Sequence, residues 1–136
     1  MVRDIVRDMF FLAQKSKPAT AKDRKIADDL LDTLRANSER CVGMAANMIG
    51  ECKRIIAIAD GKEYLVMFNP VIVSKEHPYE AEEGCLSLLG VRTTTRYEQI
   101  TLEYQDMKLR RKRARFSGFT AQIIQHECDH LEGILI

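Results

Sequence analysis

The chain has 136 residues, of which 46% are hydrophobic and 30% are charged, and its formal net charge is +1. This length fits a single domain over residues 1–136, and the composition is ordinary for a soluble globular protein. The small net charge gives no argument for a specific nucleic-acid partner, and no apolar run approaches a membrane span. Because the N-terminus also lacks the long apolar stretch of a secretory signal, we expect a cytoplasmic protein without membrane contact.

The first half of the chain predicts mainly helix. Residues 1–14 carry apolar side chains at helical spacing, and residues 15–20 form a loop around a proline. Between residues 22 and 37 apolar positions recur every three or four residues, which predicts an amphipathic packing helix. The next segment, CVGMAANMIG at 41–50, consists largely of small residues and contains two glycines.

From residue 54 onward the chain predicts short strands and one more helix. Asn69-Pro70 is expected to end the first strand pair, and residues 80–90 are expected to be irregular. A last helix is predicted over 119–131, so the fold class is α+β with mostly antiparallel pairing. The predicted extended segments are residues 54–59, 64–68, 71–73, 100–105 and 108–116.

The strongest chemical signal is the HExxH pattern formed by His126, Glu127 and His130. On a helix, residues four apart lie on one face, so both imidazoles can bind the same metal ion. The carboxylate of Glu127 then lies where it can act as a general base toward water at the metal. A chance match is the alternative, but two of only three histidines fall in this pattern on a predicted helix.

A metal site needs a third protein ligand. The pattern of zinc proteases that place a third His downstream fails, because that position is Ile136, so the ligand is expected upstream. His77, the carboxylates at 80–83 and the cysteines are the candidates, and Cys85 stands out in a glycine-bounded turn. Cys41 and Cys52 are expected to be small buried residues with free thiols. The side chain of the fourth cysteine, at position 128, is expected to point away from the ligand face.

Three motifs together resemble the peptide deformylase family, which carries GxGxAAxQ, EGCLS and QHExDH in this order. The chain has CVGMAANM at 41–48, EGCLS at 83–87 and QHECDH at 125–130. The second and third motifs match in full, and the resemblance extends from about residue 24 to the end of the chain. It implies antiparallel sheets wrapped around a central metal-binding HExxH helix.

The resemblance implies a metal-dependent amidohydrolase that removes the N-formyl group from the N-terminal methionine of newly synthesised proteins. Cys85, His126 and His130 would hold one divalent ion, Fe²⁺ in the cell, with Zn²⁺, Ni²⁺ or Co²⁺ as alternatives. Glu127 would be the general acid/base, and the backbone N–H of Leu86 would help to hold the developing oxyanion. The residues expected to bind the N-formylmethionyl peptide are Val42, Gly43, Glu83, Arg92, Phe119, Gln122 and Ile123.

The first motif departs from the family pattern, because Met48 stands where the family has Gln. A methionine cannot donate the hydrogen bond that this Gln gives to the formyl oxygen. Asn47 is the neighbouring amide that could replace it. Two alternatives therefore stay open: a hydrolase of another N-acyl amide, and a metal-binding relative with little turnover. The pairing of Glu83 also stays open, because the family's Arg corresponds to Arg96 only after a one-residue shift.

The segment KLRRKRAR at 108–115 is strongly basic. One interpretation is a transient contact with ribosomal RNA, in keeping with a co-translational task. The other, which we favour, is a solvated hairpin, because no aromatic residues interleave the basic ones for base stacking. The sequence gives no indication of the oligomeric state.

Overall fold

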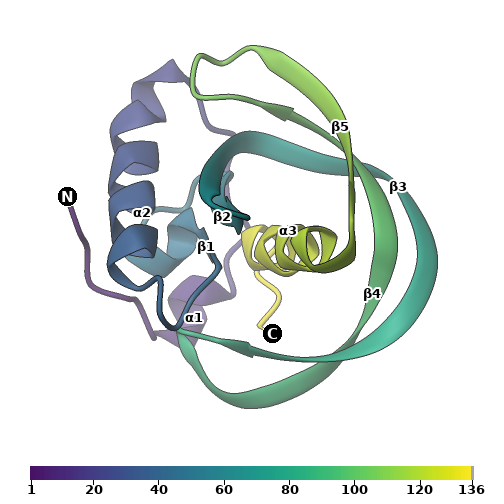
Figure 1. Ribbon diagram of the computed structural model, residues 1–136. Helices are drawn as coiled ribbons and strands as arrows, with labels where there is room; N and C mark the ends of the chain where they lie inside the picture. The colour runs from purple at the N-terminus through teal and green to yellow at the C-terminus, as the bar shows by residue number, and fades with distance from the viewer. Residues whose placement is uncertain (136) are drawn as a thin grey trace.

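In the computed structural model, which describes residues 1–135, five strands form an antiparallel sheet in the order β1-β2-β3-β4-β5. Each strand therefore pairs with its neighbour in the sequence, and the predicted α+β class is confirmed. Figure 1 shows β3 and β4 curving around the last helix, which lies inside the sheet. The strands are β1 (Gly43–Ala45), β2 (Ile55–Asp60), β3 (Glu63–Cys85), β4 (Leu88–Gln105) and β5 (Arg111–Ser117).

Three α-helices and two short 3₁₀ helices complete the described fold. The predicted amphipathic helix and the predicted last helix are both present, as α2 and α3. None of the helices within residues 1–135 is long and apolar enough to cross a membrane. The helices are α1 (Met9–Leu12), η1 (Ala21–Asp23), α2 (Arg24–Ala36), η2 (Ala46–Ile49) and α3 (Gly118–Leu131).

The helical interpretation of residues 1–14 is wrong for most of that segment. Residues 1–8 are extended, and only α1 follows, with the Asp8 side chain accepting from the backbone of Phe10. The extended backbone finds its partners elsewhere: the N–H of Arg3 donates to the hydroxyl of Thr33, and that of Val6 donates to a carbonyl in η2. Tertiary contacts thus override the helical spacing.

The expected break at Asn69-Pro70 is also wrong, because β3 continues through it. Asn69 has a φ of 53°, and the pairing with β4 shifts register between Phe68 and Val71. Its side chain exchanges two hydrogen bonds with the backbone of Ala19 and donates a third to Gln105, which stabilises this conformation. Such a bulge bends a strand without ending it. The segment 80–90, expected to be irregular, is likewise the end of β3 and the start of β4.

Strand β2 is buried on both of its faces. Along β2, Ile55 and Ala57 belong to a core shared with α2 and η2, whereas Ile56 and Ile58 belong to a second core shared with α3. This alternation follows from the two-residue period of a strand. Because all four residues are fully buried, β2 is the central wall between the two cores.

Helix α3 is held against β4 by the side chain of Gln125, the residue before the HExxH motif. Gln125 accepts a hydrogen bond from the N–H of Tyr97 and donates one to its carbonyl, both at 2.8 Å. At the other end of the helix, Asn47 donates to the carbonyl of His130, and Arg54 forms an ion pair with Glu132 at 2.8 Å. The hydrogen bonds of Gln125 and Asn47, rather than this exposed ion pair, set the rotation of α3, and so the direction in which its two histidines point.

Candidate metal centre

Three metal-ligating side chains converge at the inner face of α3. The Nε2 atoms of His126 and His130 lie 3.0 Å apart, and one ligand atom from each of Cys85, His126 and His130 lies within 4.8 Å of the others. The histidines meet because they are one helical turn apart. Cys85 comes from the end of β3, where the register with β4 shifts and the strand turns back at Leu88.

The donor set fits a single divalent transition-metal ion. One thiolate and two imidazoles suit Zn²⁺, Fe²⁺ or Co²⁺ better than they suit Mg²⁺ or Ca²⁺, which prefer oxygen ligands. Nδ1 of His126 lies 2.8 Å from the carboxylate of Glu83, so a proton on Nδ1 would leave Nε2 to bind a metal ion beside His130 and Cys85. A carboxylate partner of this kind orients a histidine ligand and raises its basicity.

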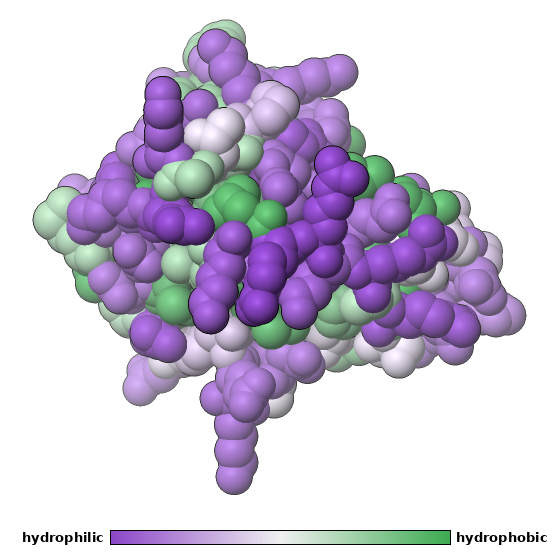
Figure 2. Space-filling view, turned by 90° about the horizontal axis from the view of Figure 1, so that it is seen from above, coloured by the Kyte–Doolittle hydropathy of each residue, from purple (hydrophilic) through white to green (hydrophobic). Residues whose placement is uncertain are grey.

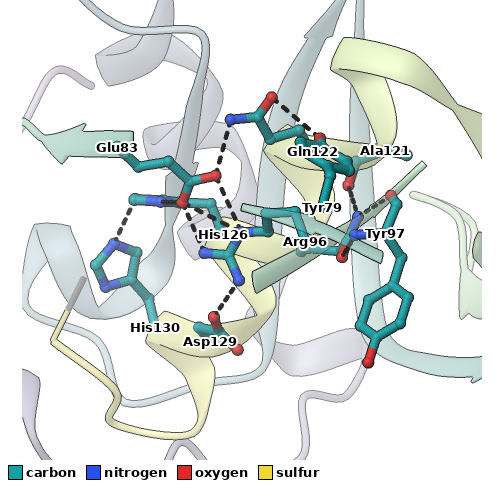
Figure 3. A network of polar contacts seen from close by, with 10 residues as sticks. Tyr79, Glu83, Arg96, Tyr97, Ala121, Gln122, His126, Asp129 and His130 are labelled. Atoms are coloured by element: carbon teal, nitrogen blue, oxygen red, sulfur yellow. Dashed lines mark hydrogen bonds and ion pairs between the residues drawn. The ribbon is translucent and has the colours of Figure 1, made fainter. Parts of the chain in front are cut away.

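Glu83 is the centre of a buried polar network that supports His126 (Figure 3). The guanidinium of Arg96 forms a two-pronged contact with Glu83, with bonds of 2.7 and 2.9 Å, and also pairs with Asp129 at 2.7 Å. Gln122 donates to the same carboxylate at 2.9 Å and accepts from the hydroxyl of Tyr79. The partner of Glu83, which the sequence left open, is therefore Arg96.

Burial and hydrogen bonding shift the pKa values of Glu83, His126 and His130 in different directions. Burial raises the pKa of Glu83, but hydrogen bonds from His126, Arg96 and Gln122 outweigh burial and lower that pKa to about 2. Burial lowers the pKa of His126, but contacts with Cys85 and Glu83 raise it to about 10. Burial and the charge of His126 together lower the pKa of His130 to about 3. A metal cation between His126 and His130 would take the place of the proton that the raised pKa of His126 implies.

Glu127 lies beside the ligands in an enclosed position. It is 4% exposed, and its Oε1 has no hydrogen-bond partner among the described residues. Burial raises its pKa to about 7. Its Oε2 faces Gly43 of the edge strand β1, where the Cβ of any larger residue would lie only 3.0 Å away. An unpartnered carboxylate oxygen in such a site is available to accept a proton.

A cavity of about 250 Å³ opens beside Cys85, His126 and Glu127. Eight of the other residues selected from the sequence also line it, namely Val42, Gly43, Met48, Glu83, Leu86, Phe119, Gln122 and Ile123. Asn47 does not line this cavity, since its amide is bonded to the carbonyl of His130. It therefore does not replace the missing Gln, and Met48, 1% exposed, lies in the cavity wall itself.

The structure does not bring Arg92 into this cavity. Its guanidinium turns back to the carbonyl of Leu89 in its own hairpin, at 3.2 Å. Cys41 was expected to be buried, and it is only partly buried: it packs against the core and also lines the cavity, where its thiol donates to the carbonyl of Gly43. Arg40 and Glu82 also line the cavity. Glu82 belongs to the acidic cluster at 80–83 that the sequence offered as a possible third ligand, whereas no signal in the sequence distinguished Arg40 from other surface charges.

Gly43→Ala is expected to lower turnover by about 10- to 100-fold while metal content stays unchanged. A Cβ at this position would lie 2.6 Å from Cγ2 of Ile123, so it must displace Ile123 or Glu127. Steady-state kinetics together with metal analysis would measure both effects. The double variant Gly43→Ala/Ile123→Ala should recover part of the loss, because it removes the clashing methyl group. Wild-type turnover in Gly43→Ala would show that Ile123 and Glu127 can move aside without loss of activity.

Comparisons with known proteins agree with this geometry. The sequence profile described as polypeptide deformylase matches residues 3–136. A peptide deformylase from Clostridium beijerinckii is 57% identical over 136 residues and is aligned over 100% of both chains. A peptide deformylase crystal structure from Legionella pneumophila superposes with a TM-score of 0.89 at 34% identity, covering 99% of this chain and 83% of that one. A Met-Ala-Ser-bound peptide deformylase from Acinetobacter baumannii gives 0.89 at 28% identity, covering 99% and 97%.

Proposed function

Because this chain belongs to the peptide deformylase family, hydrolases that remove the N-formyl group from nascent peptides, we propose that Cys85, His126 and His130 hold its divalent metal ion. Their convergence within 4.8 Å is the observation that carries the proposal. We propose Fe²⁺ as the ion in the cell, with Zn²⁺, Ni²⁺ and Co²⁺ as substitutes, since one thiolate and two imidazoles accept all four.

A divalent ion held by these three residues would act as a Lewis acid, lowering the pKa of the attacking water and polarising the formyl carbonyl. Glu127 takes the proton from that water and later delivers it to the amine that leaves. Its enclosed position and its free Oε1 support this role. The backbone N–H of Leu86, next to Cys85 on the cavity wall, would donate to the oxygen as it becomes an oxyanion.

We propose that the peptide binds in an extended form along β1. This strand is an edge of the sheet, so an added strand would pair along it at Gly43, next to Val42. Phe119, Gln122 and Ile123 line the cavity beside Glu127 and would contact the methionine side chain. The related Acinetobacter baumannii structure with bound Met-Ala-Ser supports a peptide of this length as the substrate.

The test is formate release from a formyl-Met-Ala-Ser peptide by Fe²⁺-loaded protein kept without oxygen. We expect clear release by the wild-type chain, whereas Cys85→Ala and His126→Ala should lose the metal. If protein that holds its metal releases no formate from this peptide, the assigned substrate is wrong, and other N-acyl amides should be tested.

Met48→Gln is expected to raise the rate of formate release by tenfold or more, because one oxyanion donor is typically worth about 10²–10³ in turnover. Met48 lines the cavity and donates no hydrogen bond, and Asn47 is bonded elsewhere. The matched control is Met107→Gln, a half-buried position outside the cavity, which should leave the rate unchanged. An unchanged or lower rate in Met48→Gln would mean that the formyl oxygen is already fully bonded by other donors.

We propose that the enzyme acts in the cytoplasm, with at most a transient contact with the ribosome. Figure 2 looks onto the end of the molecule that carries the β4–β5 turn, and this face is mainly hydrophilic. Much of the positive charge of the basic segment 108–115 is offset by neighbouring acids, since Arg110 pairs with Asp106 and Arg113 with Glu103. This offset supports a solvated hairpin rather than a dedicated RNA-binding surface.

A further inference from the structure

The extended N-terminal segment reaches the active site. This N-terminal arm, residues 1–8, passes along α2 and ends at α1, next to the tip of the β3–β4 hairpin (Figure 1). That tip contains Cys85 and Leu86, the proposed metal ligand and oxyanion donor. The arm is therefore close to the reaction centre, although it precedes the three family motifs in the chain.

Two adjacent residues of the arm bind the two backbone segments that flank the proposed formyl site. The N–H of Val6 donates to the carbonyl of Met48 at 2.8 Å, and Nη1 of Arg7 donates to the carbonyl of Leu86 at 2.8 Å. Met48 and Leu86 both line the cavity. The dipeptide thus connects η2 to the turn at residues 85–88, which we call the catalytic turn.

The arm is itself held firmly, so it can act as a fixed base. Arg3 forms an ion pair with the fully buried carboxylate of Asp29 at 2.8 Å and with Glu51 at 2.9 Å. Ile5 packs against the core shared by α2 and η2. A side chain that extends from such a base holds its partner in place, whereas one on a mobile tail would not.

The catalytic turn has few other side-chain restraints. Ser87 is buried, but its hydroxyl has no hydrogen-bond partner within residues 1–135. Among residues 1–135 Arg7 forms no ion pair, so its guanidinium is available for the bond to the carbonyl of Leu86. The peptide plane that carries the Leu86 N–H joins the Cα atoms of Cys85 and Leu86. A metal ion would hold the Cys85 side chain before this plane, and Arg7 holds the Leu86 carbonyl after it. Fixing both ends fixes the direction of the N–H.

We propose that Arg7 is a positioning residue, which holds the catalytic turn so that the Leu86 N–H faces the oxygen of the formyl group. The proposal rests on the function proposed above for Leu86. It assigns a catalytic consequence to a solvent-exposed arginine outside the cavity. Because the contact is exposed, its loss should change the free energy of unfolding little. An oxyanion donor that has turned away no longer stabilises the transition state, so the rate of the reaction should fall.

The experiment compares Arg7→Met with Arg24→Met, the same change at an exposed arginine at the start of α2 that lies outside the cavity. Formate release from formyl-Met-Ala-Ser is measured for the metal-loaded variants, together with metal content and thermal midpoint. In Arg7→Met we expect kcat to fall about tenfold with KM unchanged, because the lost interaction is made in the transition state. Arg7→Lys, which keeps a cationic donor, should recover part of kcat.

Hydrogen exchange gives a readout that does not depend on activity. Backbone amides of residues 84–90 should exchange several-fold faster in Arg7→Met than in Arg24→Met, whereas those of α3 should be unchanged. Equal kcat and equal exchange in the two variants, with an active wild type, would overturn the role of Arg7. A wild type that releases no formate while it holds its metal would instead overturn the proposed function, so the two failures are distinguishable.

Discussion

Glu127→Gln is expected to bind the divalent metal as tightly as the wild-type chain does, while its rate of formate release falls by about 10²–10⁴-fold. Glutamine keeps the shape of the side chain but cannot take up a proton. Glu127 lies outside the three-ligand cluster, and its Oε1 makes no other bond among residues 1–135, so no structural contact is lost with the charge. Metal analysis and formate release on the same preparation measure the two properties.

The matched control is Glu132→Gln, in the cap that follows the same helix. Glu132 is exposed and pairs with Arg54, away from the cavity, so its turnover should remain near that of the wild type. A Glu127→Gln protein that has lost its metal would contradict the separation of ligand and base. One that keeps full turnover would show that another group moves the proton.

Arg96→Met is expected to lower the free energy of unfolding by about 3–5 kcal/mol, because it leaves the buried Glu83 carboxylate without its main partner. The Arg96 and Glu83 side chains are 4% and 6% exposed, so water cannot replace the lost contact. Metal affinity should also fall, by about 10- to 100-fold, since Glu83 orients His126. Urea unfolding at one fixed metal concentration and competition with a chelator would measure these losses.

Arg113→Met is the control for this prediction, because Arg113 pairs with Glu103 on the surface at 3.5 Å. An exposed pair contributes at most about 1 kcal/mol. The double variant Arg96→Met/Glu83→Met removes both charges, and it should be more stable than Arg96→Met alone if the unpaired carboxylate is the cause. Equal stability of Arg96→Met and the wild type would show that the network does not stabilise the fold.

Local patterns predicted the parts of the molecule that depend on local spacing. The helical period predicted α2 and α3, and the interval between His126 and His130 placed two ligands on one face without any tertiary information. Cys85 was chosen as the third ligand from its turn and from the family motif. Each of these residues lies within a short motif, so the local spacing of residues was enough to select it.

The missed features depend on contacts between distant segments. Asn69 resembles a strand breaker, but its side chain bonds to Ala19 and Gln105, which lie 50 and 36 residues away, and β3 continues. The N-terminal arm has helical spacing, but its backbone donors are taken by Thr33 and Met48. Such partners follow from the assembled fold, and no periodicity in the segment itself reveals them.

The nearest-neighbour order of the sheet has a consequence for the folding kinetics. Each strand pairs with the next one along the chain, so the hairpins close short loops and can form early. Helix α3 is different, because it contacts β1 and β2, and Cys85 lies 41 residues before His126. Three of the four proposed catalytic side chains arrive with this helix. In refolding experiments, metal uptake should therefore report the late docking of α3 rather than the formation of the sheet.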